Sequence, residues 1–181
     1  MKEELRKKYK IIRKQVIDKE IKSEIIEKKL IKTKEFINAK IVGVYISLKD
    51  EVNTNEIIKE CFKINKKVAI PKVLNEHIIE FYTIKENEKL HEGLYHIMEP
   101  NNKNIISKDD IDLMIIPGIC FDKQKNRIGY GKGYYDTYLK NTRIYKIGIC
   151  FNEKLMNEHE IKVEENDIKL DKIITDKKVI L

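Results

Sequence analysis

The stretch NRIGYGKGYYD, residues 126–136, carries the residue types that bind phosphate. The chain has only seven glycines, yet three of them stand at alternate positions: 129, 131 and 133. Glycine adopts backbone angles that other residues avoid and lets a ligand approach the main chain, so successive N–H groups can converge on an anion here. Arg127 and Lys132 add full positive charges. The pattern therefore predicts a phosphate-binding loop.

This loop differs from the two common nucleotide-binding fingerprints. A P-loop closes with Gly-Lys followed by Ser or Thr, but Gly133 follows Lys132 here. The dinucleotide fingerprint needs a glycine where this chain has Tyr134. A tight connection between a strand and a helix is the alternative reading of the three glycines.

Two acids are candidates for a magnesium ion beside bound phosphates. Asp136 lies in the first turn of the helix expected after the loop, and a carboxylate beside phosphates is a usual partner of Mg²⁺. Asp167, in EENDIKLD, is the second candidate, although spacing alone does not bring it near Asp136. Tyr134 and Tyr135 face different directions on a helix, so one can stack on a flat heterocycle while the other packs.

The elements that must position these residues alternate between helices and apolar strands. Periodicity predicts helices over 2–20 and 21–38, a helix that opens at Thr54 and runs through Phe62, and a helix over 133–141. Strands are expected over 40–47, 66–71 (ended by Pro71), 78–84, 111–118 and 145–150. Residues 85–108 read as irregular, and a short tail with acidic residues finishes the chain.

These elements predict a three-layer α/β/α sandwich. Strands that are apolar on both faces and alternate with helices argue for a mostly parallel sheet covered on two sides. Ligands bind such sheets at the carboxyl edge of the strands, where the glycine loop is expected. We expect residues 1–181 to form a single domain.

The composition describes a charged chain without a membrane or secretion signal. Apolar residues make up 41% and charged residues 37%, and the N-terminus is charged from its second residue, so we expect a cytoplasmic protein. Cys61, Cys120 and Cys150 lie far apart and are expected to be buried free thiols. The net charge of +7 allows a nucleic-acid partner, but lysines alternate with acids along the whole sequence, as on a solvated surface.

Six segments together resemble the 5-formyltetrahydrofolate cyclo-ligase family, also called methenyltetrahydrofolate synthetase. They are DLMIIPGICFDKQKNRIGYGKGYYD (112–136), KEELRKKY (2–9), YISLKDEVNT (45–54), VAIPKV (68–73), GLYHIMEP (93–100) and ENDIKLDKIITD (165–176). The resemblance extends over almost the whole chain and implies a three-layer α/β sandwich. It also implies that ATP and Mg²⁺ are used to convert 5-formyltetrahydrofolate to 5,10-methenyltetrahydrofolate, with ADP and phosphate as products.

The resemblance assigns roles to residues of this sequence. It implies ATP contacts by Lys2, Arg6, Arg127, Ile128, Gly129, Tyr130, Gly131, Lys132, Gly133, Tyr134 and Tyr135. It implies folate contacts by Ile46, Glu51, Tyr130, Gly131, Lys132, Gly133 and Tyr134, and magnesium contacts by Asp136 and Asp167. Glu99 and Pro100 match a family segment but receive no role.

These residue types suit a phosphoryl transfer to the formyl oxygen. Such a transfer needs charge neutralisation and alignment, and Arg127 and Lys132 are the candidates for the first. Glu51 is a candidate acceptor for the aminopyrimidinone edge of the pterin. The chain has no tryptophan, so Tyr45, Phe81, Tyr82 or Tyr130 is expected to stack on the pterin.

Two departures from the family pattern are visible in the loop. Lys132 stands where many relatives carry Gly, and Thr137 stands where a basic residue is frequent. Two other functions stay open at this point: a generic small-molecule phosphotransferase using the same loop, and a basic nucleic-acid-binding protein. For the cyclo-ligase we expect a monomer that binds neither nucleic acid nor membranes.

Overall fold

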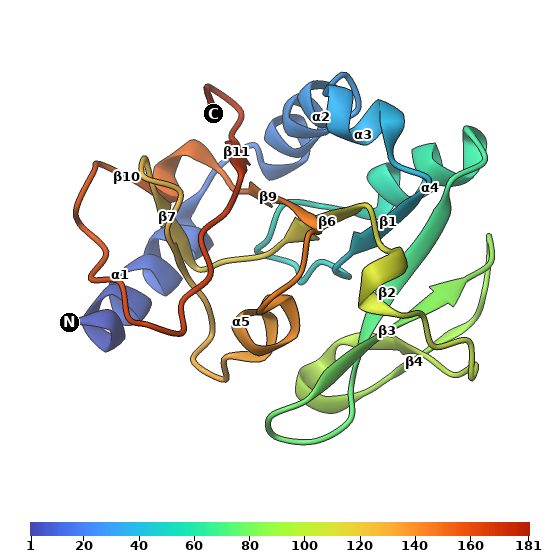
Figure 1. Cartoon of the computed structure of the whole chain (residues 1–181). Helices are drawn as coiled ribbons and strands as arrows, with labels where there is room; N and C mark the ends of the chain where they lie inside the picture. Colours follow the sequence, from blue (N-terminus) through green and yellow to red (C-terminus); the bar gives the residue numbers. More distant parts are fainter.

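A computed structural model describes residues 1–181, and its centre is a seven-stranded sheet (Figure 1). Its strands lie side by side in the order β12 (Val179–Ile180), β11 (Lys172–Ile174), β9 (Tyr145–Ile149), β6 (Leu113–Ile116), β1 (Ile41–Val44), β2 (Lys67–Val73) and β3 (Ile79–Ile84). The five strands from β11 to β2 are mutually parallel, and β12 and β3 pair antiparallel at the two edges. The expected mostly parallel α/β architecture is confirmed.

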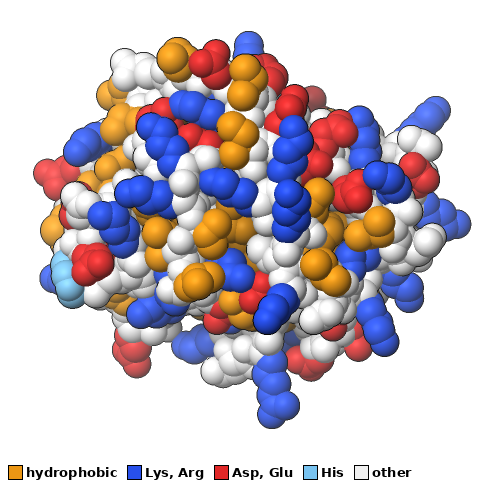
Figure 2. Space-filling model, turned by 90° about the horizontal axis from the view of Figure 1, so that it is seen from above, with side chains coloured by type: hydrophobic (Ala, Val, Ile, Leu, Met, Phe, Trp, Pro, Cys, Tyr) orange, Lys and Arg blue, Asp and Glu red, His pale blue; other side chains and the backbone are white.

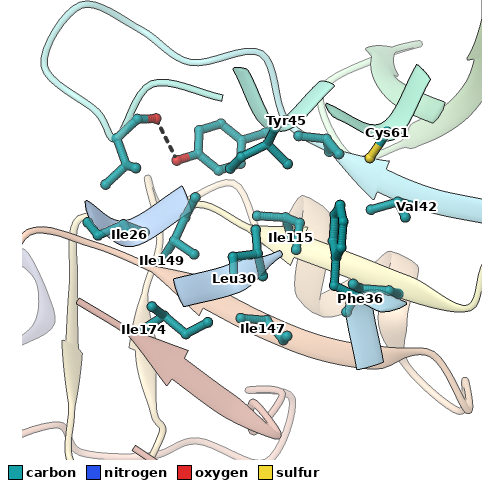
Figure 3. Packing of buried hydrophobic residues seen from close by; sticks show 14 of the residues in the cluster. Ile26, Leu30, Phe36, Val42, Tyr45, Cys61, Ile115, Ile147, Ile149 and Ile174 are labelled. Atoms are coloured by element: carbon teal, nitrogen blue, oxygen red, sulfur yellow. Dashed lines mark hydrogen bonds between the residues drawn. The ribbon is translucent and has the colours of Figure 1, made fainter. Parts of the chain in front are cut away.

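Helices cover both faces of this sheet. Three helices, α2 (Lys19–Leu30), α3 (Lys34–Asn38) and α4 (Asn55–Lys63), pack on one face through Leu30, Phe36 and Cys61. Figure 3 shows these side chains against isoleucines and valines of β1, β6, β9 and β11, with the Tyr45 hydroxyl donating to the carbonyl of Val52. The helix α5 (Tyr134–Leu139) packs on the opposite face through Tyr138 and Leu139. This arrangement gives the three expected layers.

Two small sheets stand beside the main one. The strands β7 (Cys120–Asp122), β8 (Arg127–Ile128) and β10 (Leu155–Met156) form a three-stranded sheet, and β4 (Leu90–Glu92) and β5 (Met98–Pro100) form a hairpin. The helix α1 (Lys2–Gln15) buries Tyr9 against Cys120 and Ile128 of the three-stranded sheet. This packing brings the N-terminus of the chain to the segment that leads into the glycine loop.

Several predicted boundaries were wrong. The expected helix over 2–20 ends at Gln15, because Val16 turns away from the helix and buries its side chain in the main core. The expected helix over 21–38 is divided into α2 and α3, and Thr33 caps α3 by accepting a hydrogen bond from the amide of Phe36. The strand over 40–47 ends at Val44, the helix over 133–141 spans only Tyr134–Leu139, and residues 85–108 and the tail contain short strands.

Pro71 does not end its strand, contrary to the prediction. β2 continues to Val73, and Pro71 pairs with Phe81 of β3. The pairing of β2 with β1 stops at Ala69, so Pro71 has a neighbouring strand on one side only. Proline is tolerated at such half-edge positions because its missing N–H need not break a ladder.

Other expectations hold. The helix α4 follows Thr54, and Cys61, Cys120 and Cys150 are buried and free. Thr54 does not cap α4 with its side chain; its hydroxyl donates to the carbonyl of Tyr45. None of the helices is both long and apolar enough to cross a bilayer.

Candidate active site

One large cavity opens at the carboxyl edge of the parallel strands. Its volume is about 760 Å³. Residues at or just beyond the ends of β1, β2 and β6 form its floor, among them Tyr45, Val73 and Pro117. This is the edge at which an α/β sheet is expected to bind its ligand.

Every residue to which the family resemblance assigned an ATP, folate or magnesium contact lines this cavity. They are Lys2, Arg6, Ile46, Glu51, Arg127, Ile128, Gly129, Tyr130, Gly131, Lys132, Gly133, Tyr134, Tyr135, Asp136 and Asp167. Four chain segments far apart in the sequence therefore meet here: α1, the loop after β1, the glycine loop and the segment around Asp167.

The glycine loop joins β8 to α5 with its amides free. Gly131 has φ +101° and Gly133 has φ +69°, backbone conformations that other residues rarely adopt. The N–H groups of Tyr130, Gly131, Lys132 and Gly133 donate to no group within the chain. Lys132 is exposed and has neither an ion-pair partner nor a hydrogen-bond partner. Free amides and a free cation at one cavity wall are suited to bind an anion.

Lys2 and Arg6 on α1 face this loop. The Arg6 Nε donates to the carbonyl of Gly129 at 3.0 Å, so α1 and the loop are directly tied. The Lys2 ammonium lies 2.6 Å from Asp167 and 3.1 Å from Glu164. Burial alone would lower the pKa of Lys2, but these two carboxylates outweigh it and raise the pKa above the ordinary value. Lys2 is therefore fully charged at neutral pH.

The chain segment that holds Asp167 contacts Asp136, which spacing alone could not show. Asp136 accepts a hydrogen bond from the amide of Ile168 at 3.2 Å, so it lies against the residue next to Asp167. Its other oxygen accepts from Arg127 at 2.8 Å. No group of three or more acidic, His or Cys side chains that could hold a metal ion is present. A cation here would therefore take most of its ligands from a bound phosphate and from water, as Mg²⁺ commonly does.

Arg127 is buried beneath the loop and links several segments of the cavity wall. Its guanidinium donates to the carbonyl of Pro117 at 3.2 Å and to Asp136, and it lies over the ring of Tyr135. Lys154, only 2% exposed, donates to the next carbonyl, that of Gly118, at 2.7 Å. Two cations thus hold the turn that follows β6.

Burial lowers the pKa of Lys154 below its ordinary value of 10.5. At a pH between the lowered pKa of the folded protein and 10.5, Lys154 binds a proton more fully in the unfolded chain than in the folded one. Folding stability therefore rises with pH in that range. We expect Lys154→Met to be at least as stable as the parent near neutral pH, with the parent gaining on the variant as pH rises to about 10. Melting temperatures of both proteins across this range check the prediction; a difference that stays constant with pH contradicts it.

Sequence reasoning missed Arg13, which joins the two walls of the cavity. Arg13 donates to the hydroxyl of Tyr130, and that hydroxyl donates to Glu51. The Arg13 guanidinium also lies 3.7 Å from the Glu51 carboxylate, and both side chains are buried. Enclosure of the Tyr130 hydroxyl, together with the Glu51 charge, raises the pKa of Tyr130 above its usual value, so it stays a donor. The glycine loop and the loop after β1 are therefore fixed to each other through α1.

Removing Arg13 should leave a buried carboxylate without its ion-pair partner. We expect Arg13→Met to lower the free energy of unfolding by about 3 kcal/mol, because breaking a buried pair exposes the other charge to the desolvation penalty. Urea titration of the variant measures this. Lys14→Met, at an exposed neighbour on the same helix, is the matched control; equal losses for the two variants would show that the pair contributes little.

Two of the four aromatic residues that were candidates for stacking on the pterin line the cavity. Tyr45 and Tyr130 line it, whereas Phe81 and Tyr82 do not. Tyr95, which no pattern singled out, belongs to the β4–β5 hairpin and also lines the cavity. Its hydroxyl lies 3.5 Å from that of Tyr134. Tyr134 in turn donates to the carbonyl of Asn75. Three segments thus meet through hydroxyls at this side of the cavity.

The surface charges are mixed in sign. On the face in Figure 2, Lys and Arg side chains are spread widely, with acidic and hydrophobic side chains between them. A nucleic-acid backbone requires a continuous basic track, which this face does not offer.

Comparison with known proteins places the chain in a family. The profile of the 5-formyltetrahydrofolate cyclo-ligase family matches residues 1–176. A probable 5-formyltetrahydrofolate cyclo-ligase of Schizosaccharomyces pombe is 36% identical, covering 84% of this chain and 83% of the relative. The 5-formyltetrahydrofolate cyclo-ligase of Mus musculus is 32% identical, covering 83% of this chain and 80% of the relative.

Solved structures agree with the sequence comparisons. The NMR structure of Aquifex aeolicus 5,10-methenyltetrahydrofolate synthetase superposes with a TM-score of 0.86 at 32% identity, over 98% of this chain and 91% of that one. A 5,10-methenyltetrahydrofolate synthetase from Mycoplasma pneumoniae superposes with a TM-score of 0.78 at 26% identity, over 97% of this chain and 98% of that one.

Proposed function

We infer that this chain, which belongs to the 5-formyltetrahydrofolate cyclo-ligase family, couples the conversion of 5-formyltetrahydrofolate to 5,10-methenyltetrahydrofolate to the consumption of ATP. We propose that Mg²⁺ assists and that ADP and phosphate are released. The reaction passes through a formyl group that carries the transferred phosphoryl group.

One observation carries this proposal: a single cavity has two chemically different ends, and the glycine loop borders both. At one end lie the cations Lys2, Arg6 and Lys132 with the free loop amides. At the other end lie apolar side chains of β2, β3 and the β4–β5 hairpin, such as Val73, Ile79 and Ile97. The first end suits a nucleotide triphosphate and the second a flat heterocycle, so the two ligands would meet at the loop.

The cationic end supports phosphoryl transfer. In such reactions negative charge spreads over the transferred group, and the protein contributes mainly by neutralising that charge and aligning the reactants. Lys132 has no partner to release before it binds a phosphate, and the loop amides donate to no group within the chain. Magnesium, when bound between the nucleotide and Asp136 and Asp167, would neutralise further phosphate charge. The donor set fits this ion because Mg²⁺ is usually bound by one or two carboxylates plus phosphate oxygens.

The chemistry explains why a phosphoryl donor is required. A formamide oxygen is a poor leaving group. Transfer of the γ-phosphoryl group to it makes it a good one, and ADP departs. The N10 lone pair then forms a bond to the formyl carbon, N10 loses its proton, and the bond to oxygen breaks with its electron pair leaving on phosphate.

Glu51, in the loop after β1, is a candidate for holding the pterin. Its Oε2 accepts from the amide of Leu48 at 2.9 Å and its Oε1 accepts from Tyr130. A carboxylate offers about four lone-pair positions, so it retains acceptor capacity for a ligand. The bonds to Leu48 and Tyr130 would hold it in a fixed orientation.

Absorbance in the near ultraviolet tests the proposal, because methenyltetrahydrofolate absorbs at longer wavelength than the substrate. Purified protein with 5-formyltetrahydrofolate, ATP and Mg²⁺ is expected to produce this band. Omitting ATP, or removing the metal with a chelator, should abolish it. A band that grows at the same rate without ATP would overturn the proposal. ATP turnover with no dependence on the folate would instead favour a generic phosphotransferase.

A further inference from the structure

Glu99, on β5, is a buried carboxylate at the apolar end of the cavity. Its side chain lines the cavity, and the residue is only 3% exposed. Its Oε1 accepts a hydrogen bond from the amide of Val73 at 3.0 Å. Its Oε2 has no hydrogen-bond partner within the chain. This oxygen is not fully enclosed by the protein, so it faces the cavity and can accept a hydrogen bond from a ligand there.

The other acidic side chains of the cavity all have cationic partners. Glu51 pairs with Arg13, and Asp136 pairs with Arg127. Glu164 and Asp167 share Lys2. Glu99 is therefore the one cavity-lining carboxylate that no Lys, Arg or His neutralises. A ligand that carries N–H donors would supply what the protein does not.

The surroundings of Glu99 are shaped around this carboxyl group. Gly93, on the facing side of the hairpin, lies so close that a Cβ there would collide with the Glu99 carboxyl. The hydroxyl of Tyr134 is near enough to respond to its charge: burial, Tyr95 and neighbouring acids including Glu99 raise the pKa of Tyr134 to about 12. The hairpin thus presents Glu99 to the same part of the cavity that Tyr134 borders.

We propose that Glu99 is a folate-binding residue, whose Oε2 accepts hydrogen bonds from the N–H groups of the reduced pterin ring. The inference rests on the proposed function, since it assigns the folate to the apolar end. A pterin carries N–H donors on its aminopyrimidinone edge and at N8, so two carboxylates can serve it, with Glu51 on one side and Glu99 on the other. A buried acceptor of this kind discriminates strongly, because a ligand without the donor leaves the charge unpaired.

Isothermal titration of Glu99→Gln tests the assignment. The amide oxygen can still accept from Val73, but the NH₂ group would face the ligand with a donor in place of an acceptor. We expect the affinity for 5-formyltetrahydrofolate to fall by about tenfold or more, as for loss of a hydrogen bond to a charged group. The affinity for ATP should stay within about twofold of the parent, whereas general damage to the cavity would weaken both ligands. Glu92→Gln is the matched control, because Glu92 lies exposed in the same hairpin, outside the cavity, and bonds only His96.

A second variant keeps the inference testable if Glu99→Gln folds poorly. Glu99→Asp keeps the charge but withdraws the carboxylate by one methylene, and it too should bind the folate more weakly with ATP binding retained. A folded Glu99 variant with parental affinity for the folate overturns the inference and leaves the proposed function intact. A parent protein that binds ATP but no 5-formyltetrahydrofolate overturns both.

Discussion

Asp136→Asn is expected to lower kcat/KM for ATP by about 10³-fold, the largest effect of any single substitution proposed for this chain. The Asp136 carboxylate accepts from Arg127 with one oxygen and from the amide of Ile168 with the other. An asparagine has one acceptor oxygen, so it cannot keep both bonds, and it removes one of the two negative charges proposed to hold magnesium. The Mg²⁺ concentration for half-maximal rate should therefore rise by about tenfold or more.

Two measurements separate this effect from unfolding. The variant should lose about 1–3 kcal/mol of stability, since Arg127 or Ile168 is left without its acceptor; a thermal melt shows whether it is folded under assay conditions. Asp110→Asn provides a control, because Asp110 is an exposed acid outside the cavity. A variant with unchanged Mg²⁺ dependence and nearly parental activity would remove Asp136 from the metal site.

Lys132→Gln is expected to lower kcat/KM for ATP by about 10²-fold with almost no change in stability. Lys132 is exposed and has no partner in the folded protein, so its removal breaks no contact. Its only proposed partner is the phosphate chain of ATP, whose charge it would neutralise during transfer. Steady-state kinetics with varied ATP, alongside a thermal melt, check both parts.

Lys10→Gln makes the same charge change on the exposed surface of α1 and is the matched control. Equal losses of activity in the two variants would mean that Lys132 acts only through the general positive field of the protein. A large loss for Lys132→Gln together with a lowered melting temperature would point instead to a structural role for the loop.

The fold was largely predictable because most of its main strands are apolar runs of four residues or more that alternate with helices. The strands β1, β2, β3, β6 and β9 and the helix α4 lie where periodicity placed them, apart from their ends. The short strands β4, β5, β7, β8, β10, β11 and β12 were missed, since two or three residues carry no period that a pattern can detect. Pro71 misled the prediction because its place at a half-paired position depends on strand order, which a sequence does not display.

The site was predictable where its residues share one segment. The glycine loop carries its signal in consecutive residues, so Gly129 to Asp136 could be found directly. Lys2, Arg6 and Glu51 came from family resemblance alone, and Asp167 was a candidate by its residue type with no sign that it lay near Asp136. The meeting of these residues in one cavity depends on tertiary packing. Arg13 and Glu99 gained no role, because a single charged residue on a helix or strand looks like a solvated one until its burial is known.

The most direct test of the central claim follows the formyl oxygen. If the formyl group of the substrate carries heavy-isotope oxygen, phosphoryl transfer to that oxygen predicts that the label leaves on inorganic phosphate. Mass spectrometry of phosphate after a single turnover should find one labelled oxygen for each methenyltetrahydrofolate formed. Unlabelled phosphate, with the label recovered in water while the product band appears, would contradict a phosphorylated formyl intermediate.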